Sequence, residues 1–355
     1  PWSGRENAEI FEWTDNDAAG LRMYTEKLLG YRAESAINDA LVMAAMARAH
    51  NPLQDYLTGT VWDGVPRLDT VYIDYFGDED NVYTREVGRK SLTAAVARAM
   101  QPGVKYDTTV VISGPQGTCK TTFVERIGKD WQTSLMVSFK DPKAVAEVLQ
   151  NNWIIEIGEM SALNKADINM VKQIITQTSD EYRAAYARST EKHKRHSVFF
   201  GTTNDTEYLK DPTGNRRFWP IRCGKNPAKS IWDELTPEVV DQLWAEAVTY
   251  WRIGEPLILS KEAEVIAEKR REEHKERDEL EGIIAAFLEK PVPSNWMKMN
   301  ANQRGMYLDG MISEAERQNM TLVQRDRVCV AEIWQECLEE RRKLIRKQDS
   351  IRIAR

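Results

Sequence analysis

The pattern of apolar and polar positions divides the chain into a helical first part, a middle part with strands and a helical last part. Residues 15–50 and 82–101 place apolar side chains at helical spacing, and the second stretch ends at a Pro-Gly step. Residues 51–70 lie between them and contain Asn-Pro, Asp-Gly and Val-Pro steps. Such steps are typical of turns, so we expect a connector here, held in place by a buried Trp62.

Three short apolar runs predict β-strands in the middle of the chain. They are "TTVVIS" (108–113), "WIIEI" (153–157) and "SVFFGTT" (197–203), and helical stretches separate them. Short apolar strands that alternate with helices are typical of a mostly parallel sheet with helices on both faces. The predicted fold class is therefore α/β, with three layers.

The pattern becomes helical again after the strands. Residues 233–252 predict one helix, and residues 259–290 predict a long, heavily charged helix that packs by a narrow apolar stripe. "PVPSNW" breaks the chain next, and residues 327–348 read as a basic helical segment. We therefore expect four regions: a helical N-terminal domain (1–104), a strand-containing core (105–225), a helical region (226–290) and a C-terminal helical segment (291–355).

Composition excludes several classes of protein. A hydrophobic share of 42% argues against a disordered chain, and a net charge of -6 in 355 residues argues against a globally basic nucleic-acid binder. The four cysteines form no C-x-x-C pair, which favours a reducing, cytoplasmic setting. No apolar run approaches the ~20 residues that span a bilayer. Since the chain opens at Pro1 without a signal-peptide pattern, we expect a fragment or a trimmed chain.

"GPQGTCKT" follows the first predicted strand and has nearly the form G-x-x-x-x-G-K-[ST] of a loop that wraps nucleotide phosphates. Backbone N–H groups at a helix N-terminus bind phosphate there, the lysine reaches the β- and γ-phosphates, and the hydroxyl of the last residue binds Mg²⁺. We therefore expect ATP and Mg²⁺ as cofactors. The predicted cofactor-binding residues are Gly114, Pro115, Gln116, Gly117, Thr118, Cys119, Lys120, Thr121 and Thr122.

Cys119 stands where the motif has its second glycine. A Cβ at that position shifts the loop or weakens binding, although most donors to phosphate belong to the main chain. The residue tunes nucleotide affinity, adds redox sensitivity or is simply tolerated. We expect bound nucleotide to protect Cys119 from alkylation.

Hydrolysis requires further groups at the ends of neighbouring strands. Glu156 ends an apolar run and is predicted to hold Mg²⁺ with Thr121, while Glu159 polarises the attacking water; the two roles can also be reversed. Asn204 follows the third strand and can hold that water against the γ-phosphate. Alone, each glutamate also fits a surface carboxylate and Asn204 the start of a turn, although a Glu inside "WIIEI" is costly to bury without a cation or donor nearby.

Two adjacent arginines, Arg216 and Arg217, lie in a glycine-containing turn before "FWPI". At least one must point outward, and in an oligomer such a guanidinium can reach a neighbour's γ-phosphate. The alternative is a salt bridge within the loop. We include both arginines among the predicted catalytic residues.

Residues 182–200 resemble two extended arms around a tip, "STEKHKR". Residues 183–222 contain nine Lys or Arg and four Asp or Glu, which is a local basic excess in an acidic chain. Such a patch can follow the phosphates of single-stranded DNA, and a solvated hairpin tip is an equally good interpretation. The predicted DNA-binding residues are Arg183, Arg188, Lys192, His193, Lys194 and Arg195.

These segments resemble the virulence-associated protein E family of prophages and genomic islands. The resemblance rests on "NPLQDYLTGTVWDGVPRLD", "GPQGTCKTTF", "WIIEIGEMSAL", "YRAAYAR" and "GTTNDTEYLKDPTGNRRFWPI", with a weaker match at "VCVAEIWQECL". It implies a superfamily 3 helicase-type AAA+ ATPase core, often a hexameric ring, and a partial winged-helix-like C-terminal segment. By position, Lys120 and Thr121 match the nucleotide loop, Glu156 or Glu159 the acidic motif, Asn204 the sensor, and Arg216 or Arg217 the arginine finger. Cys119 and the "EIGE" spacing depart from the family pattern.

Two functions follow from these observations. The first is an ATP-dependent DNA translocase or helicase-like motor in the replication of a prophage or mobile element, with replication proteins as further partners. The second is a nucleotide-switched DNA-binding or scaffold protein that hydrolyses ATP slowly. The ordered motif set and the basic hairpin favour the first, and Cys119 and the acid spacing favour the second. A small-molecule kinase fits poorly, because no lid or acceptor pocket is evident.

Overall fold

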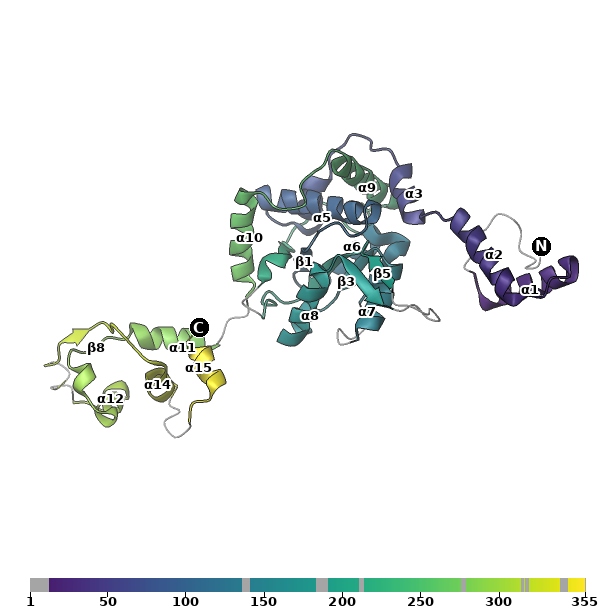
Figure 1. The fold of residues 1–355 in the computed structure, drawn as a ribbon. Coiled ribbons are helices and arrows are strands. Elements are labelled where there is room, and N and C mark those ends of the chain that lie inside the picture. The colour runs from purple at the N-terminus through teal and green to yellow at the C-terminus, as the bar shows by residue number, and fades with distance from the viewer. Residues whose placement is uncertain are drawn as a thin grey trace.

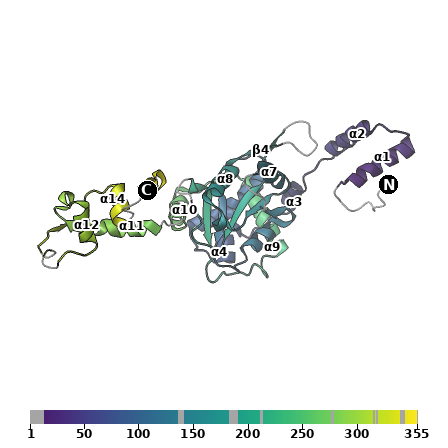
Figure 2. The same cartoon turned by 90° about the horizontal axis from the view of Figure 1, so that it is seen from below.

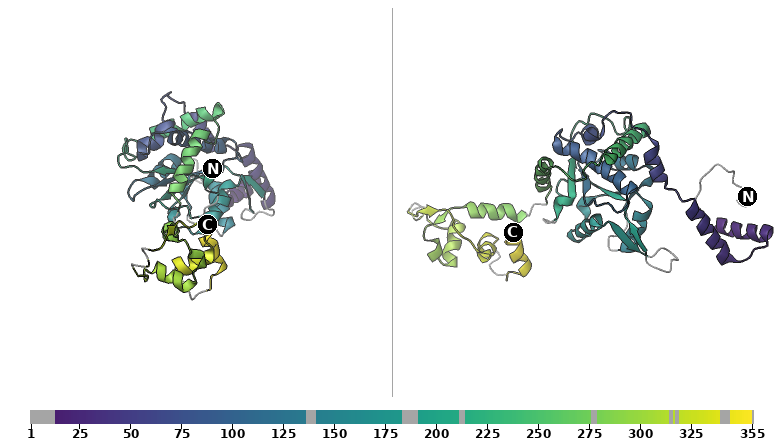
Figure 3. Two further views of the ribbon diagram at one scale, coloured as in Figure 1. Left: turned by 90° about the vertical axis from the view of Figure 1, so that its left-hand side faces the viewer. Right: turned by 45° about the horizontal axis from the view of Figure 1, so that its top comes forward.

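The computed structural model describes residues 13–135, 141–182, 191–210, 214–275, 279–313, 316, 319–338 and 344–354. Figures 1 and 3 show an α/β body in the middle of the chain. The helix pair α1 (Asp15–Leu29) and α2 (Glu34–Ala47) lies beyond one end of this body, and the segment from α11 (Glu279–Glu289) onward lies beyond the other. No helix in the described part of the chain is long and apolar enough to cross a membrane.

One parallel sheet forms the centre of the body (Figure 2). Its strands, in spatial order, are β2 (Gln132–Ser134), β3 (Ile154–Ile157), β6 (Val198–Thr203), β1 (Thr109–Ser113) and β7 (Phe218–Arg222). Every neighbouring pair is parallel, and β1 lies between β6 and β7. The predicted α/β class is confirmed.

The three strands expected from the sequence are β1, β3 and β6, and all are buried along their whole length. The other two carry weaker signals. β2 is a polar three-residue segment, and β7 contains Pro220, which cannot donate to a ladder. Because β7 is an edge strand that pairs only with β1, the missing N–H costs little there.

Alternate residues of the strands face two separate apolar layers. Val110 and Phe200 pack into a core shared with α3 (Pro52–Gly59), α4 (Val71–Phe76), α5 (Val82–Met100), α6 (Lys120–Gly128), α9 (Pro237–Arg252) and α10 (Lys261–Glu273). Val111 and Phe199 face a second core with α7 (Pro142–Asn151) and α8 (Lys165–Thr176). The side-chain period of two in a strand thus produces the three layers.

The larger core crosses the domain boundaries expected from the sequence. It contains residues from Leu53 to Ala267. Trp153, directly before β3, shows why: its indole donates a 2.9 Å hydrogen bond to the carbonyl of Ala95 in α5, and its ring centroid lies 4.4 Å from that of Trp244 in α9. Residues 104 and 225, the expected boundaries, therefore both lie within the stretch that contributes to this one core.

The connector expected at 51–70 is partly helical. Asn51 accepts hydrogen bonds from the N–H groups of Leu53 and Gln54, and Pro52 occupies the first turn, so α3 begins there. Trp62 is half-buried, in contrast to the expectation, and donates to the carbonyl of Val65.

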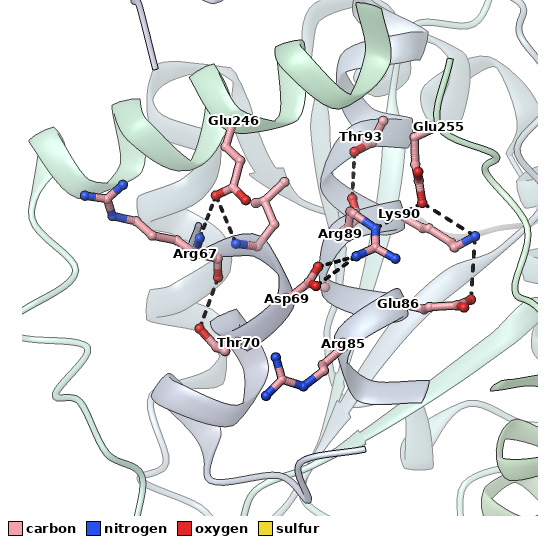
Figure 4. Close-up of polar contacts among 12 residues, drawn as sticks. Arg67, Asp69, Thr70, Arg85, Glu86, Arg89, Lys90, Thr93, Glu246 and Glu255 are labelled. Atoms are coloured by element: carbon pink, nitrogen blue, oxygen red, sulfur yellow. Dashed lines mark hydrogen bonds and ion pairs between the residues drawn. The ribbon is translucent and has the colours of Figure 1, made fainter. Parts of the chain in front are cut away.

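A set of charged side chains fixes the next part of this connector to α5 and α9 (Figure 4). Glu246 of α9 is fully buried and accepts hydrogen bonds from the N–H groups of Arg67 and Leu68, where the short helix η1 (Leu68–Thr70) begins. Burial raises the pKa of this carboxyl. On α5, Arg89 bridges Asp69 and Glu255.

The long helix expected over 259–290 does not form. α10 ends at Glu273, and Lys275 forms an isolated bridge with Leu209 instead. The described part of residues 327–348 forms short elements: α14 (Val330–Glu332), the π-turn η6 (Ile333–Cys337) and the start of α15 (Lys347–Ile353). β8 (Val292–Pro293) pairs with β9 (Leu322–Val323), and Phe287, Ile333 and Ile353 form a separate small core.

Candidate functional site

The carboxyl ends of β1, β3 and β6 meet at one edge of the sheet because these strands are parallel neighbours. Ser113 of β1 pairs with Thr203 of β6, and the loop 114–119 leaves β1 here and enters α6 at Lys120. A strand, a glycine-containing loop and a helix N-terminus thus follow each other, as the motif requires. We call this end of the sheet the carboxyl edge.

Close packing and unusual dihedral angles shape the loop. A Cβ on Gly114 would lie 2.5 Å from the Cβ of Cys223, so only glycine fits. Gly117 has φ 85° and Cys119 has φ 56°. The left-handed conformation costs a non-glycine residue about 1–2 kcal/mol, so the loop keeps a glycine-type backbone at Cys119 despite its side chain. Pro115, Gln116 and Thr118 complete the loop.

The side chain of Lys120 folds back over this loop. Its Nζ lies 2.8 Å from the carbonyl oxygen of Gly114, 2.9 Å from that of Pro115 and 3.0 Å from Oδ1 of Asn204. The residue is 8% exposed, so the ammonium sits in a cradle of oxygens rather than in water. An anion placed against the loop would offer stronger, charge-assisted partners to the same group.

Asn204 connects Lys120 to Glu159. Its Nδ2 donates a 3.1 Å hydrogen bond to Oε1 of Glu159, while its Oδ1 accepts from Lys120. The reverse orientation of the amide would place its N–H₂ against the ammonium, so the two charged neighbours fix it. Glu159 is exposed, with φ 49° directly after Gly158. The carboxylate of Glu159, the amide of Asn204 and the ammonium of Lys120 are thus linked by consecutive hydrogen bonds, which we call the contact chain.

Glu156 lies beside this contact chain, in the interior of the protein. It is 1% exposed, and three hydroxyl groups donate to its carboxylate: Thr121 (2.6 Å) and Thr202 (2.7 Å) to Oε1, and Ser134 (2.8 Å) to Oε2. These hydrogen bonds compensate for the burial of the carboxylate.

The oxygens of Thr121 and Glu156 are the pair expected to hold Mg²⁺. Mg²⁺ usually takes one or two carboxylates together with substrate phosphates and water. No cluster of three or more His, Cys, Asp and Glu side chains suited to a metal occurs within the described ranges. A cation at this edge would therefore depend on a bound phosphate for the rest of its ligands.

Arg216 and Arg217 lie at the opposite end of the sheet, which we call the amino edge. Phe218, which follows them, pairs with Thr109 at the start of β1, and Arg222 pairs with Ser113 at its end. The four residue steps from Phe218 to Arg222 span about 13 Å, so the two arginines do not join the carboxyl edge of their own chain. Arg216 is exposed, and Nε of Arg217 donates a 2.9 Å hydrogen bond to Thr176.

The basic hairpin also lies at the amino edge. β4 (Ser179–Tyr182) pairs antiparallel with β5 (Glu191–Lys194), so residues 191–194 form the return strand and not the tip. Lys192 and Lys194 are exposed and His193 is half-buried. Arg183 and Arg188 lie outside the described residues.

The structure contradicts the prediction for Arg195. This side chain is 2% exposed, forms an ion pair with Asp180 and donates to the carbonyl of Ile174 and the amide of Gln177. Its guanidinium fastens the hairpin to the end of α8, where a DNA phosphate cannot reach it. Arg195 is therefore a structural residue.

Several residues at the carboxyl edge were not predicted from the sequence. Ser134 and Thr202 bind Glu156, Cys223 packs against Gly114, and the indole N–H of Trp232 lies 3.1 Å from Sγ of Cys119. Thr202 lies at the end of β6, two residues before Asn204, which is a usable signal. The other three come from distant segments without a local motif.

The fold and the carboxyl edge define a class: an α/β domain with a phosphate-type loop, an acidic strand end and an asparagine from the adjacent strand. A family model of the virulence-associated protein E-like domain matches residues 57–276, and the chain belongs to this family. The match covers α4 to α10 and contains the whole sheet.

The fold is also similar to solved structures described as the C-terminal region of NrS-1. "The A form apo structure of NrS-1 C terminal region-CTR" is 14% identical, with a TM-score of 0.45, and the alignment covers 76% of this chain and 64% of that one. "The apo structure of NrS-1 C terminal region (305-718)" is 17% identical, with a TM-score of 0.42 and the same coverage. This chain thus spans just under two thirds of those regions. No curated protein matches the sequence.

Proposed function

We propose that this protein binds ATP with Mg²⁺ at the carboxyl edge and hydrolyses it to move along DNA during the replication of a prophage or mobile element. The observation that carries the proposal is the contact chain Lys120–Asn204–Glu159 beside the pair Thr121–Glu156. Membership of the virulence-associated protein E-like family supports it.

Each residue has a role in this proposal. Lys120 exchanges the loop carbonyls for the β- and γ-phosphates, and Thr121 and Glu156 hold Mg²⁺. Glu159 then accepts a proton from the attacking water, and Asn204 positions that water. Because Asn204 contacts both Lys120 and Glu159, movement of the lysine onto a γ-phosphate also frees the carboxylate.

The paired arginines act on a second copy of the chain. A cavity of about 540 Å³ at the amino edge is lined by Lys172, Thr176 and Arg217, among others. Two cations around one hollow can stabilise the charge that develops on a neighbour's γ-phosphate. We therefore propose a closed, ring-like homo-oligomer, with single-stranded DNA bound by the exposed lysines of the hairpin.

A nucleotide-switched DNA-binding protein with little hydrolysis is the second candidate. The hydrogen bond between Glu159 and Asn204 favours it, because a carboxylate engaged with an amide is a weaker base for water. In this second candidate function, ATP binding rearranges the hydrogen bonds among Lys120, Asn204 and Glu159, but ATP is not rapidly hydrolysed.

ATP turnover, measured with and without single-stranded DNA, tests the proposal. We expect turnover that DNA stimulates and that Lys120→Ala reduces by at least about 100-fold, because the ammonium would contact both the transferred γ-phosphate and the β-phosphate of the leaving ADP. Lys105→Ala, at an exposed lysine before β1, is the matched control and should retain full turnover. Tight ATP binding without turnover would support the second candidate, and turnover unaffected by Lys120→Ala would reject the proposed site.

A further inference from the structure

The turn between β7 and α9 places a large aromatic side chain beside the phosphate loop. Trp232 is 60% exposed, and its indole N–H donates a 3.1 Å hydrogen bond to Sγ of Cys119. Cys119 is itself part of the loop proposed to wrap the phosphates. A ring in contact with its sulfur therefore lies within the length of one nucleoside from a phosphate bound there.

The position of this ring is fixed by the residues around it. Arg126 of α6 donates hydrogen bonds to the carbonyls of Ile231 (2.7 Å), Trp232 (3.1 Å) and Leu235 (2.9 Å). Ile231 and Leu235 are 5% and 1% exposed, so their side chains anchor the turn on both sides of Trp232. The exposed indole is thus held on a rigid support.

Arg126 also covers one face of the indole. Its guanidinium carbon lies 5.3 Å from the ring centroid, which is within the range of a cation–π contact. Because the side chain is still 60% exposed, the other face is open to solvent. An indole that is held by a sulfur acceptor and a cation, with one face open, is ready to stack on a flat ring.

We propose that Trp232 is the stacking platform for the base of the bound nucleotide, with Cys119 and Arg126 as positioning residues. This inference rests on the proposed nucleotide site. Aromatic stacking accepts every base, since each base has a π-face, so the site should bind all nucleoside triphosphates. Purines offer the larger ring and should bind more tightly than pyrimidines.

Binding of ATP, UTP and inorganic tripolyphosphate, each with Mg²⁺, tests this role by calorimetry on the full chain. For Trp232→Ala we expect ATP to bind about 5- to 100-fold more weakly, while tripolyphosphate binds as to the wild type, because only the nucleotide has a base to stack. Trp232→Phe should retain most of the affinity for ATP. Trp13→Ala, at another exposed tryptophan, should change neither ligand.

The outcomes separate this inference from the proposed function. A Trp232→Ala variant that binds ATP normally, or that loses ATP and tripolyphosphate equally, would overturn the stacking role. Equal affinity of the wild type for ATP and UTP would also count against it, and that measurement needs no variant. If the wild type binds neither ATP nor tripolyphosphate, the phosphate site itself is wrong.

Discussion

The two ends of the same sheet are built on different principles. At the carboxyl edge the charged groups have partners within the chain: Lys120 lies on loop oxygens, and Glu156 accepts from three hydroxyl groups. At the amino edge, Lys192, Lys194 and Arg216 are exposed. Under the proposed function, the first edge receives the nucleotide and the second presents its exposed positive charge to DNA or to a neighbouring subunit.

Backbone strain follows the same division. Among the described residues, three non-glycine residues have positive φ, and two of them, Cys119 and Glu159, lie at the carboxyl edge. Strain of this kind persists where the surrounding structure over-determines the conformation, and it concentrates at functional sites. At the amino edge, by contrast, Arg195 shows how an ordinary buried ion pair provides rigidity.

The largest predicted effect is on ATP turnover, and it tests whether the amino edge of one subunit acts on the carboxyl edge of its neighbour. Arg216→Ala and Arg217→Ala should show which arginine acts, and the active one should lower ATP turnover by about 10³- to 10⁵-fold. Mixing that variant with Lys120→Ala should restore activity, because one supplies an intact carboxyl edge and the other an intact amino edge. In a randomly mixed ring, roughly a quarter of the interfaces combine both intact edges.

Mixing at several ratios provides the control for this experiment. Turnover should be highest near equal amounts and should disappear with either variant alone. If mixtures remain inactive although the variants co-assemble by light scattering, the arginine does not act on a neighbouring subunit, and the proposed site shared between subunits is wrong.

The second effect concerns the two glutamates of the carboxyl edge. Glu159→Gln should bind ATP as tightly as the wild type and turn it over about 10²- to 10⁴-fold more slowly, because an amide cannot accept the proton of the attacking water. Glu156→Gln should instead raise the Mg²⁺ concentration needed for ATP binding. A magnesium titration of both variants assigns the roles, and the opposite pattern would exchange them.

The sequence predicts the carboxyl edge well because its signals are local. The loop, Glu159 and Asn204 each follow a strand that is recognisable from its own apolar run, and Glu156 lies near the end of such a strand; parallel strands bring their ends together. The α/β class follows from the same runs. The amino edge was predicted less well, because charge alone does not reveal burial: Arg195 looks like its exposed neighbour Lys194 until Asp180 is placed beside it.

Long-range packing was the other part that the sequence could not supply. Trp232 reaches Cys119 from more than 100 residues further along the chain, and no spacing rule connects them. Glu246 of α9 binds the start of η1 across 178 residues of sequence, which draws the expected connector into the core. The long helix over 259–290 failed for a related reason, because Lys275 bridges Leu209 instead of continuing a helical turn.

A smaller effect should follow from the exposed lysines of the hairpin. Lys192→Ala with Lys194→Ala should weaken binding to single-stranded DNA and lower the slope of log affinity against log salt by about 1.4, from about 0.7 for each phosphate contact. Basal ATP turnover should not change, because the carboxyl edge is intact. An unchanged salt slope would remove the hairpin from the DNA interface. Arg195 is left out of this variant because its loss would leave the half-buried carboxylate of Asp180 without its ion-pair partner.

The smallest effect is a pH dependence of stability shared by both edges. His196 precedes β6 at the amino edge, and His274 contacts Thr206, two residues after Asn204, at the carboxyl edge. Burial lowers the pKa of both imidazoles below the usual 6.5. Between the two pKa values, the imidazoles are therefore protonated in the unfolded chain and neutral in the folded chain. The free energy of unfolding should fall as the pH drops through 6.5 toward the folded-state pKa.

Single variants assign this pH dependence to one edge or the other. Chemical denaturation between about pH 7.5 and 5.5 should show a smaller loss of stability for His196→Gln and for His274→Gln than for the wild type. Protonation of His274 should also affect the proposed nucleotide site, because Nε2 of His274 accepts a hydrogen bond from Arg222 and cannot do so once protonated. As the pH is lowered, ATP affinity should then decrease in the wild type and decrease less in His274→Gln. His196→Gln should lose as much affinity as the wild type. An equal response of ATP affinity in both variants would show that the two edges are not independent.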